Sequence, residues 1–279
     1  TPSSSRSSIV VAPLSGSIRN SALVGFGTRL HFCYNVPRWL IWAVSCSIDS
    51  FIGAGMGQGH DLVIVAATRT AIGRFQGALR DIPVTQLGAV ALGESMRRAG
   101  IDPSLVDEVL MGNVLQSGVG QAPARQSALL AGLPSQVGAT TLNKVCGSGL
   151  KALMLGAAMI RAGDASVILA GGMESMNGAP YLLAHARFGY RLGDSTMVDS
   201  LVHDGLWCAM EHQHMGLAAE WIAETYQVSR QAMDAYALSS HQRALAALDR
   251  GAFRGEIVPV ALPSSRGSPP GSASTSPRS

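Results

Sequence analysis

The segment between Gly147 and Gly163 places the strongest constraint on how this chain folds. Its length and its bounding glycines predict a helix over residues 147–162, yet leucine, methionine, isoleucine and alanine fill nearly every position and leave almost no polar face. A helix that is apolar all round has to be covered on all sides, and this one is too short for a membrane span. Because one sheet covers only one side of such a helix, another layer must cover the other side.

Short apolar runs alternate with helical patterns around this segment. Strands are predicted at residues 62–66, 109–111, 140–142 and 167–170, and further helices at residues 84–99 and 123–131. The continuous run at 62–66 is typical of a strand buried on both faces. Gly100 is placed to end a helix, and Asp102 with Pro103 is a capping pair for a short helix. The alternation predicts an α/β layered fold with a mostly parallel sheet.

The two ends of the chain lack this pattern. Residues 1–48 contain no acidic side chain, so residues 1–60 are predicted to be a leader or a non-native extension without regular structure. Residues 263–279 are rich in Ser, Pro and Gly, which predicts a disordered tail. Between the ends we expect an α/β domain over residues 61–175 and part of a loop-rich domain over residues 176–262. The second of these has helices predicted at 215–226 and 229–250.

Composition excludes several classes of function. The net charge is only +3, and no Lys/Arg-rich block is interleaved with aromatic residues, which argues against nucleic-acid binding. The four cysteines are widely spaced and form no Cys-x-x-Cys pair, so neither a disulfide framework nor a metal site is expected. The apolar stretch at residues 39–44 is too short for a membrane span. We expect a cytoplasmic protein with no membrane partner, or a mitochondrial one if the acid-free leader is genuine.

Cys146 falls where a predicted strand meets the apolar helix, just before that helix begins. The unpaired amides and the dipole of a helix N-terminus favour a thiolate, which is the nucleophilic form of cysteine. Gly147 and Gly149 leave room for a substrate carbonyl, and the Cys146 amide can donate to an oxyanion. A cysteine in this position is more often a small apolar residue. The helix junction alone therefore does not assign catalysis to Cys146.

The residues around Cys146 carry a resemblance that favours a catalytic role over a purely structural one. Residues 142–153, Leu-Asn-Lys-Val-Cys-Gly-Ser-Gly-Leu-Lys-Ala-Leu, resemble the acyl-cysteine signature of the thiolase family. Four further segments resemble that family in the same order, at residues 63–73, 116–126, 170–176 (Ala-Gly-Gly-Met-Glu-Ser-Met) and 214–216 (His-Met-Gly). The resemblance is strongest to the acetyl-CoA acetyltransferase group. It covers residues 61–262, which correspond to the first half of a thiolase.

The resemblance implies a thiolase-like fold and an acyltransferase chemistry. Cys146 would accept an acyl group from a coenzyme A thioester, and Leu206, His214 and Met215 would line the pocket for coenzyme A and the acyl chain. Coenzyme A thioesters would be substrates, and no cofactor is implied. The family also implies a homodimer or tetramer, with residues 117–126 near the dimer interface and residues 181–200 in tetramer contacts. Without the resemblance, His214 would be a surface loop histidine, and Leu206 and Met215 ordinary core residues.

Three segments of the family pattern do not occur in this sequence. They are a Gly-His-Pro segment whose histidine activates the cysteine, a Cys-x-Gly segment whose cysteine abstracts or delivers the α-proton, and an Asn-Glu-Ala-Phe segment at an oxyanion hole. We therefore expect an incomplete chain that is inactive as a thiolase on its own. Two alternatives stay open, a β-ketoacyl synthase-like condensing enzyme and a non-catalytic fragment that binds coenzyme A or dimerises. The segments at 170–176 and 214–216 favour a thiolase.

Overall fold

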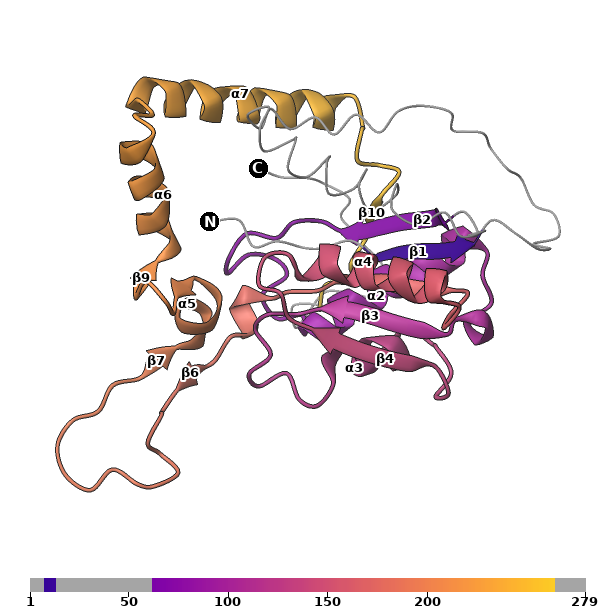
Figure 1. The fold of residues 1–279 in the computed structure, drawn as a ribbon, viewed down its shortest axis with the longest axis horizontal. Coiled ribbons are helices and arrows are strands. Elements are labelled where there is room, and N and C mark those ends of the chain that lie inside the picture. Colours follow the sequence, from indigo (N-terminus) through magenta and orange to yellow (C-terminus); the bar gives the residue numbers. More distant parts are fainter. Residues whose placement is uncertain (1–7, 14–61, 264–279) are drawn as a thin grey trace.

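A six-stranded sheet forms the centre of the molecule in a computed structural model that describes residues 8–13 and 62–263 (Figure 1). The strand order is β10-β2-β1-β5-β3-β4. β3 pairs in parallel with β4 and β5, β10 pairs in parallel with β2, and β1 is antiparallel to both of its neighbours. The mostly parallel sheet predicted from the alternating pattern is thus confirmed. Its strands are β1 (Ser8–Pro13), β2 (Leu62–Thr70), β3 (Glu108–Gly112), β4 (Gly138–Leu142), β5 (Ile168–Gly172) and β10 (Ile257–Val258).

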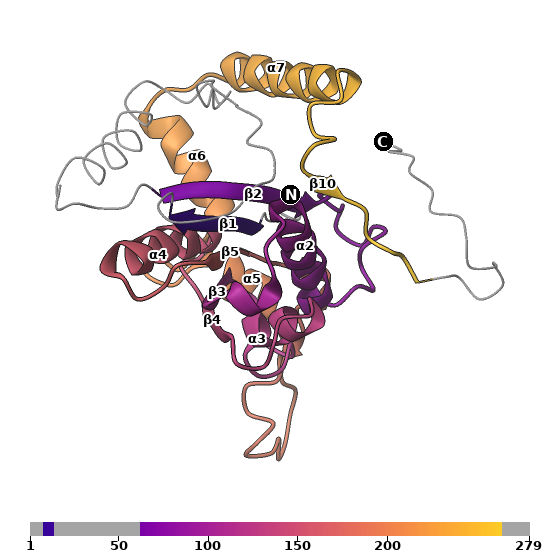
Figure 2. The same cartoon turned by 90° about the vertical axis from the view of Figure 1, so that its right-hand side faces the viewer.

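Helices cover the two faces of this sheet and make three layers. Figure 2 shows α4 (Ser148–Ala162) on one side, and α2 (Val84–Ala99) with α3 (Pro123–Leu130) on the other. Successive side chains of β3 alternate between the two faces, as the pleat requires. Val109 and Met111 pack in the core beneath α2 and α3, whereas Leu110 packs beneath α4. Both cores are built from the apolar runs that the sequence shows.

The elements predicted between residues 62 and 172 are all present, with small changes at their ends. Gly100 adopts the left-handed conformation after α2, and Asp102 accepts a hydrogen bond from the Ser104 amide at the start of the 3₁₀ turn Pro103–Leu105. The prediction that β2 is buried on both faces is wrong for Ile64, which is 53% exposed. α4 packs against β3, β5 and β1, so it leaves one face of β2 uncovered.

Two strands of the central sheet were not predicted. β1 lies within residues 1–60, where we expected no regular structure, and it inserts between β2 and β5. The rest of that segment lies outside the described residues, as does the predicted tail beyond residue 263. β10 spans only two residues, too few to produce a recognisable pattern, and it adds to the edge of the sheet beside β2.

Residues 173–256 form a long connection from β5 to β10. It begins with the 3₁₀ turn Met176–Gly178 and the ribbon of β6 (Tyr181–Leu182) and β7 (Val198–Asp199). We call the following residues 200–249 the helical arm, because Figure 1 shows its helices leaving the layered body. Helices were predicted at 215–226 and 229–250, close to the observed α6 and α7. The arm contains α5 (Ser200–Gly205), β8 (Trp207–Cys208), β9 (Gln213–His214), α6 (Met215–Thr225) and α7 (Arg230–Asp249).

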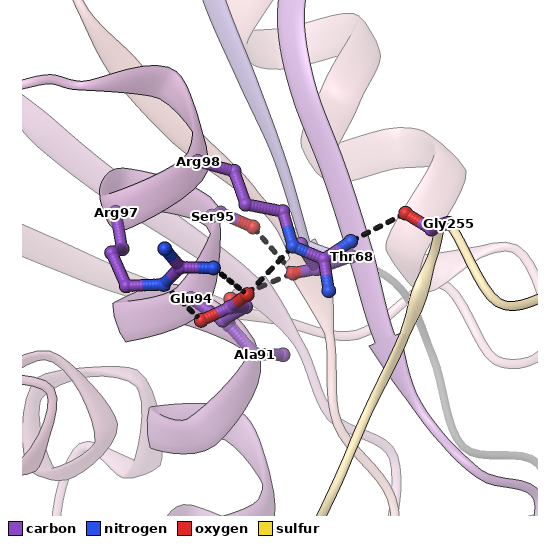
Figure 3. Close-up of polar contacts among 7 residues, drawn as sticks. All are labelled: Thr68, Ala91, Glu94, Ser95, Arg97, Arg98 and Gly255. Carbon is purple, nitrogen blue, oxygen red and sulfur yellow. Dashed lines mark hydrogen bonds and ion pairs between the residues drawn. The ribbon is translucent and has the colours of Figure 1, made fainter.

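Polar contacts attach the end of this connection to α2 and β2. Arg98 binds Glu94 within α2 and also donates to the Gly255 carbonyl oxygen (Figure 3). Arg69 of β2 binds the Glu256 carboxylate at 3.1 Å, and its guanidinium lies 5.1 Å from the centre of the Phe253 ring. Hydrogen bonds from Arg97 and then Arg98 lower the pKa of Glu94 to about 2. The chain is therefore fixed to the layered body where the helical arm returns.

Candidate active site

Residues 143–147 form a tight turn between β4 and α4, and Cys146 lies near its end. β4 ends at Leu142, where the strand predicted at residues 140–142 also ends. Cys146 is exposed and lies two residues before α4 begins. The thiol is thus accessible at the N-terminus of the apolar helix, the position from which a helix dipole favours an anion.

Val145, immediately before Cys146, has an unusual backbone conformation. Its φ angle is +49°, in the left-handed region that a β-branched residue rarely adopts. A non-glycine residue held in such a conformation costs on the order of 1–3 kcal/mol, and residues of this kind concentrate at functional sites. The Val145 amide is held by the Asn143 side-chain oxygen at 2.8 Å. The turn is a local conformation that the surrounding structure must enforce.

Ser148, the first residue of α4, supplies two further hydrogen bonds to the turn. Its hydroxyl accepts from the Lys144 amide at 2.8 Å and donates to the Val145 carbonyl oxygen at 2.6 Å. The Ser148 side chain is fully buried because α4 begins directly against the end of β3. A Cβ on Gly112 would lie 2.6 Å from the Ser148 Cβ, so only glycine fits there. Gly112 therefore allows the start of α4 to lie against the sheet.

The Cys146 amide is left open by this arrangement. The Lys144, Val145, Gly147 and Ser148 amides each donate to an oxygen of the same turn. For the Cys146 amide, no acceptor occurs in the part of the chain that the structure describes. An amide donor beside a nucleophilic atom can stabilise the oxyanion that forms when the nucleophile attacks a carbonyl. The thiol of Cys146 could thus act as a nucleophile, and the amide of the same residue could donate to the oxyanion.

Glu174 organises the same edge of the sheet, and the sequence did not identify this role. It follows β5, and its carboxylate accepts from the Val114 and Leu115 amides at 2.9 and 3.1 Å and from the Asn113 side-chain amide at 2.8 Å. The backbone amide of Asn113 donates to the Leu142 carbonyl oxygen at the end of β4. One carboxylate therefore connects the segments that follow β3 and β5, next to the strand that leads into the Cys146 turn.

The three residues predicted to line the substrate pocket lie together on the helical arm. The Met215 amide donates to the Leu206 carbonyl oxygen at 2.8 Å, and His214 is paired with Trp207 in the β8–β9 ribbon. The His214 Nδ1 atom accepts from the Gly216 amide at 3.0 Å, which leaves Nε2 as the donor of a neutral ring. No hydrogen bond joins these residues to Cys146 within residues 62–263. Together they present apolar surface and one imidazole donor.

α4 is covered on one side only. Ala152, Gly156 and Ile160 are buried against the sheet, whereas Leu150 and Met154 on the opposite side are 60% and 43% exposed. We expected this segment to be too short for a membrane span, but by length and composition alone the stretch Val145–Ala162 is long and apolar enough to cross a membrane. Its packing against β3 and β5 accounts for the apolar character of one side. For the other side, nothing within the described ranges supplies the second layer that the sequence led us to expect.

Comparison with known proteins identifies the family. The model of the thiolase N-terminal domain matches residues 62–277, which extends past residue 262, where we expected the resemblance to end. An acetyl-CoA acetyltransferase of Pseudomonas aeruginosa is 54% identical over 212 residues, which make up 76% of this chain and 54% of that protein. One from Cupriavidus necator is 51% identical over 209 residues, 75% of this chain and 53% of that protein.

A plant protein gives the same result. Acetyl-CoA acetyltransferase 2 of Arabidopsis thaliana is 48% identical over 210 residues, 75% of this chain and 52% of its own length. The chain therefore spans about half the length of the relatives it matches. The matched region includes the whole layered α/β body from β2 onward and the Cys146 turn. By this match and by the three-layered fold around the Cys146 turn, the chain belongs to the thiolase family.

Proposed function

We propose that this chain carries the acyl-accepting part of an acetyl-CoA acetyltransferase of the thiolase family, with Cys146 as the nucleophile. The observation that supports this most directly is the exposed thiol at the start of α4, beside an amide that has no acceptor within the turn. The relatives named acetyl-CoA acetyltransferases match this region at 48–54% identity. The relevant substrates would be coenzyme A thioesters, and no cofactor takes part.

In the proposed step, the Cys146 thiolate attacks the carbonyl carbon of an acyl-CoA. The carbonyl oxygen becomes an oxyanion, which accepts a hydrogen bond from the Cys146 amide. The bond between that carbon and the sulfur of coenzyme A then breaks, and the departing coenzyme A thiolate takes up a proton. The product is a thioester on Cys146. A thioester suits this task because it can pass its acyl group to another thiol or to a carbanion.

The chain is proposed to perform this half-reaction and not full turnover. The family's Gly-His-Pro and Cys-x-Gly segments, which supply the base and the second cysteine, do not occur among the 279 residues. Removing one member of a catalytic group that acts as a unit typically costs orders of magnitude in rate. We expect slow acylation of Cys146 and no measurable cleavage of acetoacetyl-CoA by this chain alone.

Leu206, His214 and Met215 are proposed to contact the acyl-CoA. Leu206 and Met215 contribute apolar surface, and the His214 Nε2 atom is free to donate because Nδ1 is occupied by the Gly216 amide. We further propose that the protein is cytoplasmic and forms homo-oligomers. The loop between β6 and β7 would contribute to oligomer contacts, since Phe188 and Leu192 are both largely exposed there.

Acyl labelling of the full chain tests the proposal. The protein is incubated with radiolabelled acetyl-CoA, and the modified peptide is identified by mass spectrometry, with Cys146→Ser as the matched variant. We expect label on Cys146 that hydroxylamine releases, and none in the variant. Label from a carrier-protein thioester but not from acetyl-CoA would instead indicate a condensing enzyme of the β-ketoacyl synthase type. Binding of acetyl-CoA with a free thiol would indicate a non-catalytic binder.

A further inference from the structure

We propose that Ser148 is a positioning residue for Cys146, whose hydroxyl holds the turn in the one conformation that presents the thiol and leaves the Cys146 amide open. This inference rests on the proposed acylation of Cys146 and names a residue on which that step depends. Ser148 is not proposed to contact the substrate. It acts through the backbone of the two residues that precede the nucleophile.

Val145 is held in a strained conformation, and the Ser148 hydroxyl is one of the contacts that hold it there. A valine at φ +49° relaxes towards the extended region unless other contacts prevent it. The Ser148 hydroxyl binds the carbonyl oxygen of Val145 and the amide of Lys144, so it holds the peptide units on both sides of the Lys144–Val145 pair. If Val145 relaxed, the peptide that carries the Cys146 amide would rotate. The Ser148 hydroxyl therefore restrains the direction of that amide, together with the Ser148 amide, which donates to the same carbonyl oxygen at 3.1 Å.

The Ser148 hydroxyl also determines which amide donors of the turn remain available. Without the Ser148 hydroxyl, the Lys144 amide would lose its acceptor and would compete with the Cys146 amide for any nearby oxygen. With the hydroxyl in place, the Lys144 amide is satisfied inside the turn. The Cys146 amide is then the donor that remains available to a substrate oxygen.

Ser148 is itself held rigidly by its surroundings. Its side chain is fully buried, and it is the first residue of α4, which rests on the sheet beside Gly112. A hydroxyl on a mobile loop could not restrain a strained neighbour. A hydroxyl fixed between a helix and a strand end can, because its own position is determined by the packing of the whole layer.

A matched pair of serine variants tests this inference in the full chain. Ser127 is also fully buried, and its hydroxyl also donates to a backbone oxygen, that of Thr85 at 2.9 Å, but it lies in α3 on the other face of the sheet. Ser148→Ala and Ser127→Ala therefore remove the same kind of bond. We expect Ser148→Ala to slow acylation of Cys146 by acetyl-CoA by about 10- to 100-fold. We expect Ser127→Ala to change it by less than about twofold.

Residue-resolved hydrogen exchange separates this inference from the proposed function. In Ser148→Ala the Lys144 amide should exchange at least about tenfold faster than in the parent chain, whereas Ser127→Ala should leave it unchanged. This readout does not require acylation. If the parent chain is not acylated, the proposed function fails, and the Lys144 exchange rate still decides the role of Ser148.

A double variant provides the final check. Glycine adopts φ +49° without strain, so Val145→Gly should make the turn less dependent on the serine hydroxyl. We expect Val145→Gly combined with Ser148→Ala to acylate several-fold faster than Ser148→Ala alone. Three results would each overturn the inference: unchanged Lys144 exchange in Ser148→Ala, equal slowing of acylation in the two serine variants, or no recovery in the double variant.

Discussion

The layered α/β body and the helical arm differ in how their apolar side chains are used. In the body, Leu92 of α2 is completely buried among side chains of the sheet. In the arm, α6 has no buried residue, and α7 buries only Ala247. Both regions form regular helices, yet among the described residues the helices of the body bury many side chains and those of the arm bury few. Helix formation and burial are thus separate properties in this chain, and the arm has apolar surface that no described residue covers.

The same substitution, leucine to alanine, made in both regions tests this difference in burial most directly. Leu92→Ala should lower the free energy of unfolding by about 2–5 kcal/mol, because it leaves a cavity in the core. Leu238→Ala in α7 should change it by less than about 0.5 kcal/mol, since Leu238 is 59% exposed. Urea denaturation followed by circular dichroism gives both values. Equal losses at the two positions would show that the arm is packed in solution.

Replacing Glu174 tests how much polar contacts contribute to the free energy of unfolding of the body, compared with its apolar core. Glu174→Ala leaves the Val114 and Leu115 amides without their acceptor, which should lower the free energy of unfolding by about 1–3 kcal/mol. Glu224→Ala in α6 serves as the control, because this glutamate is exposed. The same denaturation measurement applies. A loss at Glu174 no larger than the loss at Glu224 contradicts the role assigned to its carboxylate.

The stability contributed by α2 should depend on pH, because Glu94 binds Arg98, which also donates to the Gly255 carbonyl oxygen. Glu94 has its pKa lowered to about 2 by bonds from Arg97 and Arg98. A lowered pKa adds stability above the ordinary carboxylate pKa, and this contribution is lost as the pH falls from about 4.5 towards 2. Glu94→Gln should therefore be less stable than the parent by up to about 1 kcal/mol at pH 7.

Thermal unfolding of both proteins across this pH range checks the assignment. The difference in melting temperature should shrink as the pH approaches 2. Asp234→Asn is a suitable control, because its ion pair with Arg230 also lies within one helix, α7, but involves no residue that binds the chain near Gly255. A difference that stays constant from pH 7 to pH 2 would show that the Glu94 carboxylate is not the group responsible.

The smallest effect on stability is expected on the uncovered side of α4. Met154→Lys should change the free energy of unfolding by less than about 0.5 kcal/mol, because its side chain is 43% exposed. It should nevertheless reduce self-association, since it interrupts an apolar surface formed with Leu150. Light scattering at increasing protein concentration measures this. A large loss of stability would mean that Met154 is covered in solution.

Much of the body could be predicted from the sequence because its signals are local. Apolar runs located β3, β4 and β5, and helical spacing located α2 residue for residue. The exposure of Ile64 could not be predicted, because it depends on which strands α4 covers. The strand β1 also escaped prediction, since it derives its place in the sheet from partners that lie 49 or more residues away in the chain.

For the candidate site, too, local features could be predicted from the sequence, and contacts between distant residues could not. The position of Cys146 before a helix followed from the sequence, and its chemistry came from the resemblance to thiolases. The geometry around it did not follow. A valine gives no sign that it will adopt φ +49°, and the bonds of Glu174 join residues about sixty positions apart. Such contacts exist only after the chain has folded, so local patterns cannot reveal them.

The connection between β5 and β10 has a consequence for how this fold tolerates changes in length. Its two ends are fixed to the same sheet, by β5 on one side and by β10 with the Arg69–Glu256 pair on the other. The entropy lost in closing a flexible loop rises only with the logarithm of its length, so doubling such a loop costs about 0.6 kcal/mol. Insertions and deletions between these two fixed points should therefore be thermodynamically inexpensive, and this is where the fold has most freedom to acquire new segments.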